Sequence, residues 1–291
     1  MGKGGDNDIK KNVGIKWRKN TEYCEIKRLN DLVIEKSKNF VGISNKDGTV
    51  LTPEVHEVVN NGAVVYKKRW TFLPIIWSAI CALVVLSQFK HPLTIIVSAI
   101  IMFTWYDFYS GILHIVLDEP SFIKLPLLGE ACLEFQWHHH NPQDISSKSF
   151  LEVCGDLNLV ITILICLYLA PYCGYSYRTP LAMCLVGFKI NMAYFGQLCH
   201  CMSHTSINNR PKWVNTLQNA GLMISPKEHG KHHQTYDDNF CIGCGLCNGL
   251  LSWSRKNITS NKWAWLAFFL IVSLIDVPVF NYVLTKFGLF V

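Results

Sequence analysis

Charged residues are scarce in this sequence: Asp, Glu, Lys and Arg together make up 16%, against about 25% in an average soluble protein. The formal surplus of +6 is spread over several loops, so the sequence lacks the dense basic stripe that binds a phosphate backbone. We therefore expect no nucleic-acid partner. Scattered cations suit the anionic surface of a membrane better.

Residues 1–66 lack the apolar core of a secretory signal, and they contain acidic residues, which organellar transit peptides avoid. Asp6 stands where a myristoylation signal has Ser or Thr, so we expect no lipid anchor at this end. Turn signals at Asp47-Gly48 and Asn61-Gly62, with weak periodicity between them, predict that these residues form a polar, flexible N-terminal segment.

The twelve cysteines do not follow the pattern of a small disulfide-bonded secreted domain, and many lie in apolar runs where reduced thiols pack well. Cys241, Cys244 and Cys247 are different, because a C-x-x-C-x-x-C spacing can bind zinc or an iron–sulfur cluster. The neighbouring sequence offers no fourth ligand. Two interpretations stay open here, a metal site and free thiols beside a glycine-rich turn.

Half of the residues are hydrophobic, and they come in long blocks. About 20 apolar residues, at 1.5 Å per residue, cross a hydrocarbon core of about 30 Å, so the long blocks predict membrane-spanning helices. A fifth block, Trp263 to Phe280, is interrupted by Asp276 and Pro278, which leaves a span or a hairpin dipping into the membrane. The predicted fold is an all-α integral membrane bundle with four or five spans. The four uninterrupted blocks are residues 71–89, 93–117, 157–172 and 181–203.

Three parts follow from this pattern: the polar segment 1–66, a central part 67–260 that carries most of the histidines, and a C-terminal span or hairpin 261–291. The basic triplet Lys67-Lys68-Arg69 precedes the first span and is expected to stay cytosolic. The second and fourth spans then end on the cytosolic side. The mixed apolar and amide segment 213–224 is too short to span and is predicted to be an interfacial helix.

Eight of the eleven histidines lie near the ends of the apolar blocks, on the side predicted to be cytosolic. On a helix, His229 shares one face with His232 and His233, and the i, i+4 spacing does the same for His200 and His204. For the other three histidines we expect ordinary structural roles. The eight, with the nearby carboxylate, are His114, Asp118, His138, His139, His200, His204, His229, His232 and His233.

So many imidazoles at one membrane boundary would be poor packing material, but they suit metal ions. Imidazole and carboxylate ligands fit iron or zinc. A catalytic zinc needs about three protein ligands, so eight histidines favour two ions. Redox-active iron also explains a site at a bilayer surface, because the C–H bonds of lipid chains resist hydrolytic chemistry but can be oxidised with iron and O2.

The motifs, taken in chain order, resemble those of the Kua-type lipid desaturases over about residues 70–250. The resemblance implies a membrane-embedded oxidoreductase of lipid metabolism that acts on a phospholipid with two iron ions, O2 and electrons from a cytochrome b5-like donor. The eight histidines would be the iron ligands, and Asp118 a ligand or a partner that orients an imidazole. The motifs are Asp107-Phe108-Tyr109-Ser110-Gly111-Ile112-Leu113-His114 with Asp118, His138-His139 with Pro142, Phe150 and Gly155-Asp156, His200 with His204, Pro211-Lys212-Trp213-Val214 with Leu217-Gln218, His229 with His232-His233, and Phe240-Cys241-Ile242 with Gly245 and Asn248.

The family includes plasmanylethanolamine desaturase of the endoplasmic reticulum and a plastid phosphatidylglycerol acyl desaturase. Phe135-Gln136 and Gly221-Leu222-Met223 look closer to the plastid branch, whereas Gly155-Asp156 and Pro211-Lys212-Trp213-Val214 look closer to the plasmalogen branch. The lack of a transit peptide favours the endoplasmic reticulum membrane over a plastid membrane, and with it the conversion of a 1-O-alkyl chain to a vinyl ether. The alternatives are a fatty-acyl desaturase or hydroxylase acting on a glycerolipid, and a non-enzymatic metal transporter or sensor. Transporters usually place polar ligands near mid-membrane, not at span ends.

Overall fold

The structure is a computed structural model that describes residues 72–119, 150–169 and 179–287, single positions between 121 and 149, and two short strands. The strands, β1 (Ser44–Asn45) and β2 (Gly48–Thr49), pair antiparallel around the predicted turn at Asp47-Gly48. The predictions for the rest of the N-terminal segment, the basic triplet, His56 and His140 lie outside the described residues.

The chain divides into two compact units. The first consists of Met1–Lys68, Val116–Asp144 and His233–Tyr236, and the second of Arg69–Ile115, Ile145–His232 and Asp237–Val291. The chain passes from one unit to the other within helices α5 (Pro92–Leu117), α7 (Asp144–Ser147) and α12 (Pro226–Thr235).

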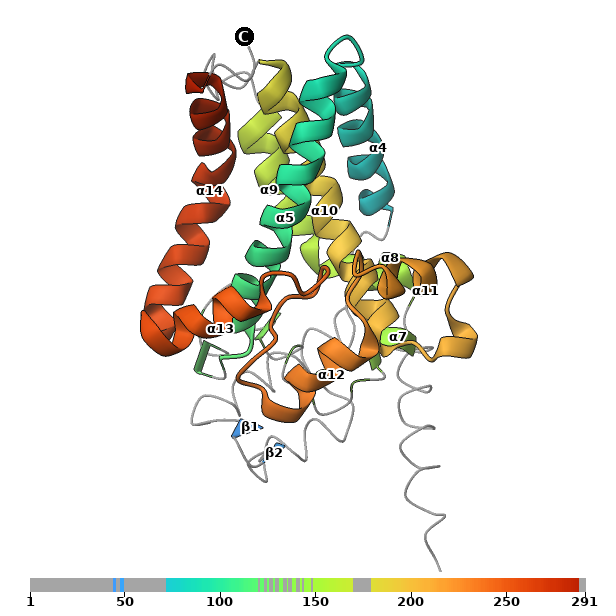
Figure 1. Cartoon of the computed structure of the whole chain (residues 1–291), viewed down its shortest axis with the longest axis vertical. Helices are drawn as coiled ribbons and strands as arrows, with labels where there is room; N and C mark the ends of the chain where they lie inside the picture. The colour runs from blue at the N-terminus through green and yellow to red at the C-terminus, as the bar shows by residue number, and fades with distance from the viewer. Residues whose placement is uncertain are drawn as a thin grey trace, which may run out of the picture. The chain divides into compact units, whose positions relative to one another are not determined.

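Five helices of the second unit run alongside one another, with α10 packed against α4 and α14 (Figure 1). Their shared core contains Met102, Leu185, Ile190 and Val277. Shorter helices connect them or lie beyond the end of the bundle at which α5 and α10 finish (Figure 1). The five are α4 (Leu73–Leu86), α5, α9 (Asn158–Leu169), α10 (Pro180–His204) and α14 (Lys262–Lys286); the shorter ones are α7 (Asp144–Ser147), α8 (Phe150–Val153), η3 (Cys154–Leu157), η5 (Ile207–Asn209), α11 (Lys212–Asn219), α12 and α13 (Asn248–Asn257).

The starts of these helices follow from local sequence. Proline, whose fixed φ suits the first turn of a helix, begins α5 and α10. Thr179 caps α10, because its side chain accepts the N–H of Ala182, and Asn261 caps α14 by accepting the N–H groups of Trp263 and Ala264.

Among the described residues, three helices, α5, α10 and α14, are long and apolar enough to cross a membrane, whereas α4 is apolar but has 14 residues. The helical architecture with long apolar helices is thus confirmed, and the predicted number of four or five spans stays a prediction. The fifth block forms one continuous helix instead of a hairpin, in spite of Asp276 and Pro278. Exposed side chains such as Leu83, Ile100 and Leu274 on the outer surface suit contact with lipid.

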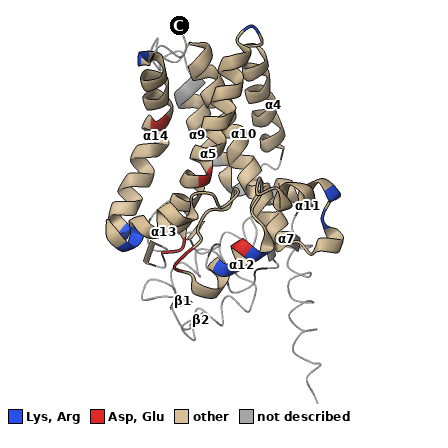
Figure 2. Ribbon diagram, in the orientation of Figure 1, with Lys and Arg blue, Asp and Glu red and all other residues tan. Residues whose placement is uncertain are grey.

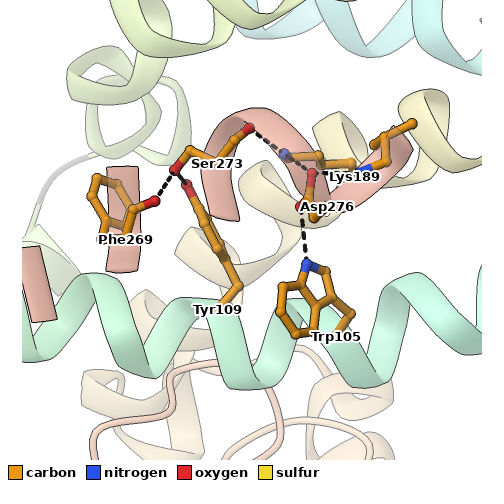
Figure 3. Close-up of polar contacts among 7 residues, drawn as sticks. Trp105, Tyr109, Lys189, Phe269, Ser273 and Asp276 are labelled. Carbon is orange, nitrogen blue, oxygen red and sulfur yellow. Dashed lines mark hydrogen bonds and ion pairs between the residues drawn. The ribbon is translucent and has the colours of Figure 1, made fainter. Parts of the chain in front are cut away.

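A buried ion pair explains how α14 tolerates its polar residues (Figure 3). The Nζ atom of Lys189 on α10 lies 2.6 Å from Oδ1 of Asp276 on α14 and donates to the backbone oxygen of Ser273 at 2.8 Å. From α5, the indole N–H of Trp105 donates to Oδ2 of Asp276 at 2.9 Å, and the Tyr109 hydroxyl lies 2.9 Å from that of Ser273. The three long helices are therefore joined by a polar cluster with matched charges.

The segment predicted as one interfacial helix over residues 213–224 is shorter in the structure. Helix α11 ends at Asn219, and Gly221 follows with a φ of +70°, a left-handed conformation that ends a helix. Trp213 is half exposed, while Met223 and Ile224 are buried against Val214. The segment is therefore a short helix followed by a turn, and the residues after the turn pack against the apolar side of the helix.

Candidate metal centre

Five of the predicted histidines gather in the second unit. The last turns of α5 carry His114, those of α10 carry His200 and His204, and α12 contributes His229 and His232. Four of them are almost fully buried, with exposed fractions of 0 to 2%, and His204 is partly buried. The helical spacing of each motif is thus what brings the imidazoles to one end of the bundle.

The first group within this unit consists of His200, His204 and His229, whose offered nitrogen atoms lie within 4.8 Å of one another. The Nε2 atoms of His200 and His229 are 3.1 Å apart. Two nitrogens that bind one ion at about 2.1 Å, with an angle of about 90 to 110° between them, lie about 3.0 to 3.4 Å apart. The spacing therefore fits two ligands of one metal ion.

The second group contains His114 and His232, whose ring centroids are 4.3 Å apart and whose offered nitrogens also lie within 4.8 Å. The Nδ1 atom of His114 lies 2.7 Å from the backbone oxygen of Phe240, and that of His232 lies 2.9 Å from the backbone oxygen of Asp238. A carbonyl oxygen only accepts, so each ring carries a proton on Nδ1, and in the neutral form of the ring the lone pair is on Nε2. This is the tautomer that a metal ligand needs.

The other predicted ligands lie in the first unit, where they contact one another. The ring centroid of His233 lies 4.9 Å from that of His138 and 5.2 Å from that of His139. Oδ1 of Asp118 lies 3.4 Å from Nε2 of His139, and both side chains are buried. Tyr236 packs against the His139 ring at 4.7 Å. Each unit therefore offers several neutral nitrogen donors, and the first adds a carboxylate, a donor set that suits iron or zinc.

The loop that carries Cys241, Cys244 and Cys247 folds around the carboxylate of Asp107. Oδ1 of Asp107, on α5, accepts the N–H groups of Cys244 and Gly245 at 2.7 and 3.0 Å, and Oδ2 accepts that of Cys247 at 2.9 Å. A Cβ at Gly243 would lie 2.8 Å from Asp107 Oδ1, so the loop needs glycine there. The signal for this role was an acid in the middle of an apolar block.

The thiols of this loop are poor metal ligands. Burial, and then the negative charge of Asp107, raises the pKa of Cys244 to about 12 and that of Cys247 to about 11. A protonated thiol does not bind metal well. Among the described residues, the groups close enough to hold an ion contain histidine and aspartate only. The free-thiol interpretation of the spacing is the one that the structure favours.

Fold and site together define a helical membrane protein with histidine-rich groups suited to bind metal. Residues 102–266 match the model of the lipid desaturase domain, and the chain belongs to this family. The predicted resemblance to lipid desaturases is thereby confirmed.

Three relatives show how far the similarity extends. Plasmanylethanolamine desaturase 1 of Mus musculus is 30% identical over 177 residues, which cover 57% of this chain and 63% of that protein. Fatty acid desaturase 4, chloroplastic, of Arabidopsis thaliana is 29% identical over 153 residues, 51% of this chain and 45% of the relative. Plasmanylethanolamine desaturase of Myxococcus xanthus is 28% identical over 145 residues, 49% and 50% of the two chains. The chain thus spans about half to two thirds of these relatives, and no solved structure matches it.

Proposed function

We propose that this protein is an O2-dependent di-iron desaturase that converts a 1-O-alkyl (plasmanyl) ethanolamine phospholipid into the vinyl-ether plasmalogen. Two hydrogens leave adjacent carbons of the alkyl chain, and together with two electrons and two protons they reduce O2 to two molecules of water. We further propose that a cytochrome b5-like protein donates the electrons. The observation that carries the proposal is the set of buried, closely spaced imidazoles in a member of the lipid desaturase family.

The eight histidines are the proposed ligands of the two ions. Bound iron supplies the capacity to activate O2 at neutral pH. The protein's own contribution is orientation and burial: the backbone oxygens of Asp238 and Phe240 fix the tautomers of His232 and His114, and Asp118 holds the His139 ring. Buried rings also keep water away from a site where an oxidant is formed.

The depth of the histidines supports an ether lipid as substrate. The first two carbons of the alkyl chain lie close to the headgroup, and His114, His200 and His204 lie in the last turns of long apolar helices rather than at their middle. The same position argues against a transporter, whose ligands lie near mid-membrane. The chloroplastic Arabidopsis relative favours a second candidate, desaturation of a fatty-acyl chain of a glycerolipid.

Lipid analysis separates these two substrates. Expression in cells that lack plasmalogens is expected to restore acid-labile vinyl-ether lipids with the wild type but not with His204→Ala, which removes an imidazole of the first group. His91→Ala is the matched control, because this histidine is exposed at the turn between α4 and α5. A new acyl double bond without vinyl ethers would support the second candidate, and no new lipid at all would contradict both.

We also propose that the histidine end of the bundle faces the cytosol from the endoplasmic reticulum membrane. Lys and Arg residues lie next to or on α11, on α12 and where α13 joins α14, all at this end (Figure 2), which agrees with the positive-inside rule. Asn257, the last residue of α13 and the first of the glycosylation sequon Asn257-Ile258-Thr259, is then expected to carry no glycan. The test is a mobility shift on glycosidase treatment, with a sequon engineered at exposed Lys90 as the positive control. A glycan on Asn257 would show that the histidine end faces the lumen instead.

A further inference from the structure

One loop, Asp237–Cys241, provides both backbone oxygens that orient histidines. Asp238 accepts from His232 through its backbone oxygen, and Phe240 does the same for His114. The Phe240 ring is fully buried, with its centroid 5.2 Å from that of His232 and 6.1 Å from that of His114. A displacement of this loop would therefore move two imidazoles together.

The loop itself is held by one face of α13. Oδ1 of Asn248 accepts the N–H of Cys241 at 2.8 Å, and the Ser252 hydroxyl donates to the Asp238 carboxylate. The guanidinium of Arg255 lies 5.0 Å above the Phe240 ring and 3.0 Å from the Asp237 carboxylate. Positions 248, 252 and 255 are spaced i, i+4 and i+7, so they share a face of the helix.

The opposite face of α13 does not take part. Leu250 and Trp253 are more than half exposed. Lys256, which follows Arg255 in the sequence and is i+4 from Ser252, is exposed as well. Asn239, in the loop, has a φ of +57°, a left-handed conformation that is uncommon for non-glycine residues, although asparagine adopts it more readily than most. Asp238 Oδ1 accepts the Asn239 N–H at 2.8 Å, which ties this conformation to the same carboxylate that Ser252 contacts.

We infer that α13 is a positioning helix for the metal centre: Arg255 and Ser252 hold the Asp237–Cys241 loop, and the loop fixes the orientation and tautomer of His114 and His232. The inference rests on the proposed metal centre. Arg255 contacts the loop in two ways, since its cation stacks on the Phe240 ring and its guanidinium pairs with the Asp237 carboxylate.

The experiment measures binding of Co²⁺ to purified full-length protein, by titration and by the visible absorption of the bound ion, which depends on ligand geometry. Arg255→Ala is expected to weaken Co²⁺ binding by about 10- to 100-fold, the usual effect of losing a partner that orients a ligand, and to change the spectrum. Ser252→Ala is expected to weaken Co²⁺ binding and change the spectrum as well, but less than Arg255→Ala does. Arg255→Lys keeps the cation and is expected to recover part of the affinity. Lys256→Ala, which removes an exposed cation next to Arg255, is the control and should match the wild type.

Each outcome decides the inference. Wild-type affinity and spectrum in folded Arg255→Ala would overturn it while leaving the metal centre intact. If Arg255→Ala does not fold, the milder Ser252→Ala and Arg255→Lys carry the test, and wild-type binding by both would overturn the inference. A wild-type protein that binds no Co²⁺ and contains no iron would overturn the proposed function as well, so the two failures are distinguishable.

Discussion

Purified full-length protein is expected to contain about two irons per chain, and His229→Ala to lose iron and desaturase activity together, by about 100-fold or more. His229 is the chosen position because its Nε2 lies 3.1 Å from that of His200 and its ring 4.7 Å from that of His204. Removing this imidazole takes one donor from the first group and leaves two buried rings without their neighbour. Metal content by mass spectrometry and turnover of a lipid substrate are measured on the same sample.

The matched control for this prediction is His91→Ala, which removes a histidine outside both groups and is expected to keep metal and activity. Circular dichroism of His229→Ala should be that of a helical protein, so that loss of iron is not loss of fold. Stoichiometric zinc without iron, after expression in iron-replete cells, would contradict the oxidase chemistry, although it would leave a metal centre in place.

The second large effect is expected at the buried ion pair. Asp276→Leu leaves the Lys189 ammonium buried in the bundle with no counter-charge, and breaking such a pair from one side costs about 3 to 5 kcal/mol. The indole N–H of Trp105 loses its acceptor as well. We expect a clear fall in the midpoint of thermal unfolding in detergent, followed by tryptophan fluorescence, and a lower yield of monodisperse protein.

The double variant Lys189→Met with Asp276→Leu tests whether charge matching is the cause. Removing both charges of a buried pair is often neutral or stabilising, so the double variant is expected to recover most of the stability that the single variant loses. Lys286→Met, at the exposed end of α14, serves as the control for loss of a lysine. Equal stability of Asp276→Leu and the wild type would show that the pair contributes nothing.

The i, i+4 spacing of His200 and His204 predicted that both lie on one helical face, and both belong to the first group. The spacing of the last motif did not predict how it divides, because His229 lies with the first group and His232 with the second. The long apolar blocks also predicted α5, α10 and α14, since length and hydrophobicity are local properties. The lipid desaturase family followed from the order of the motifs.

Contacts between distant residues could not be predicted in the same way. Asp107 accepts a hydrogen bond from Cys247, which is 140 residues away in the sequence, and Lys189 pairs with Asp276, which is 87 residues away. Separations of this length produce no periodic pattern in the sequence. The ends of α4 and α11 were misplaced for a related reason: an apolar composition continues past the residue at which the helix stops, as Gly221 shows after α11. The hydrogen bonds of His114 and His232 to backbone oxygens depend on the conformation of the Asp237–Cys241 loop, which composition does not specify.

The ion pair also sets an order of events during synthesis. Lys189 leaves the ribosome 87 residues before Asp276 does, which corresponds to about 4 to 17 s at 5 to 20 residues per second. During that interval the ammonium on α10 has no carboxylate from α14 to meet, and holding it unpaired in hydrocarbon is costly. The polar cluster that joins α5, α10 and α14 can therefore form only after α14 has been inserted.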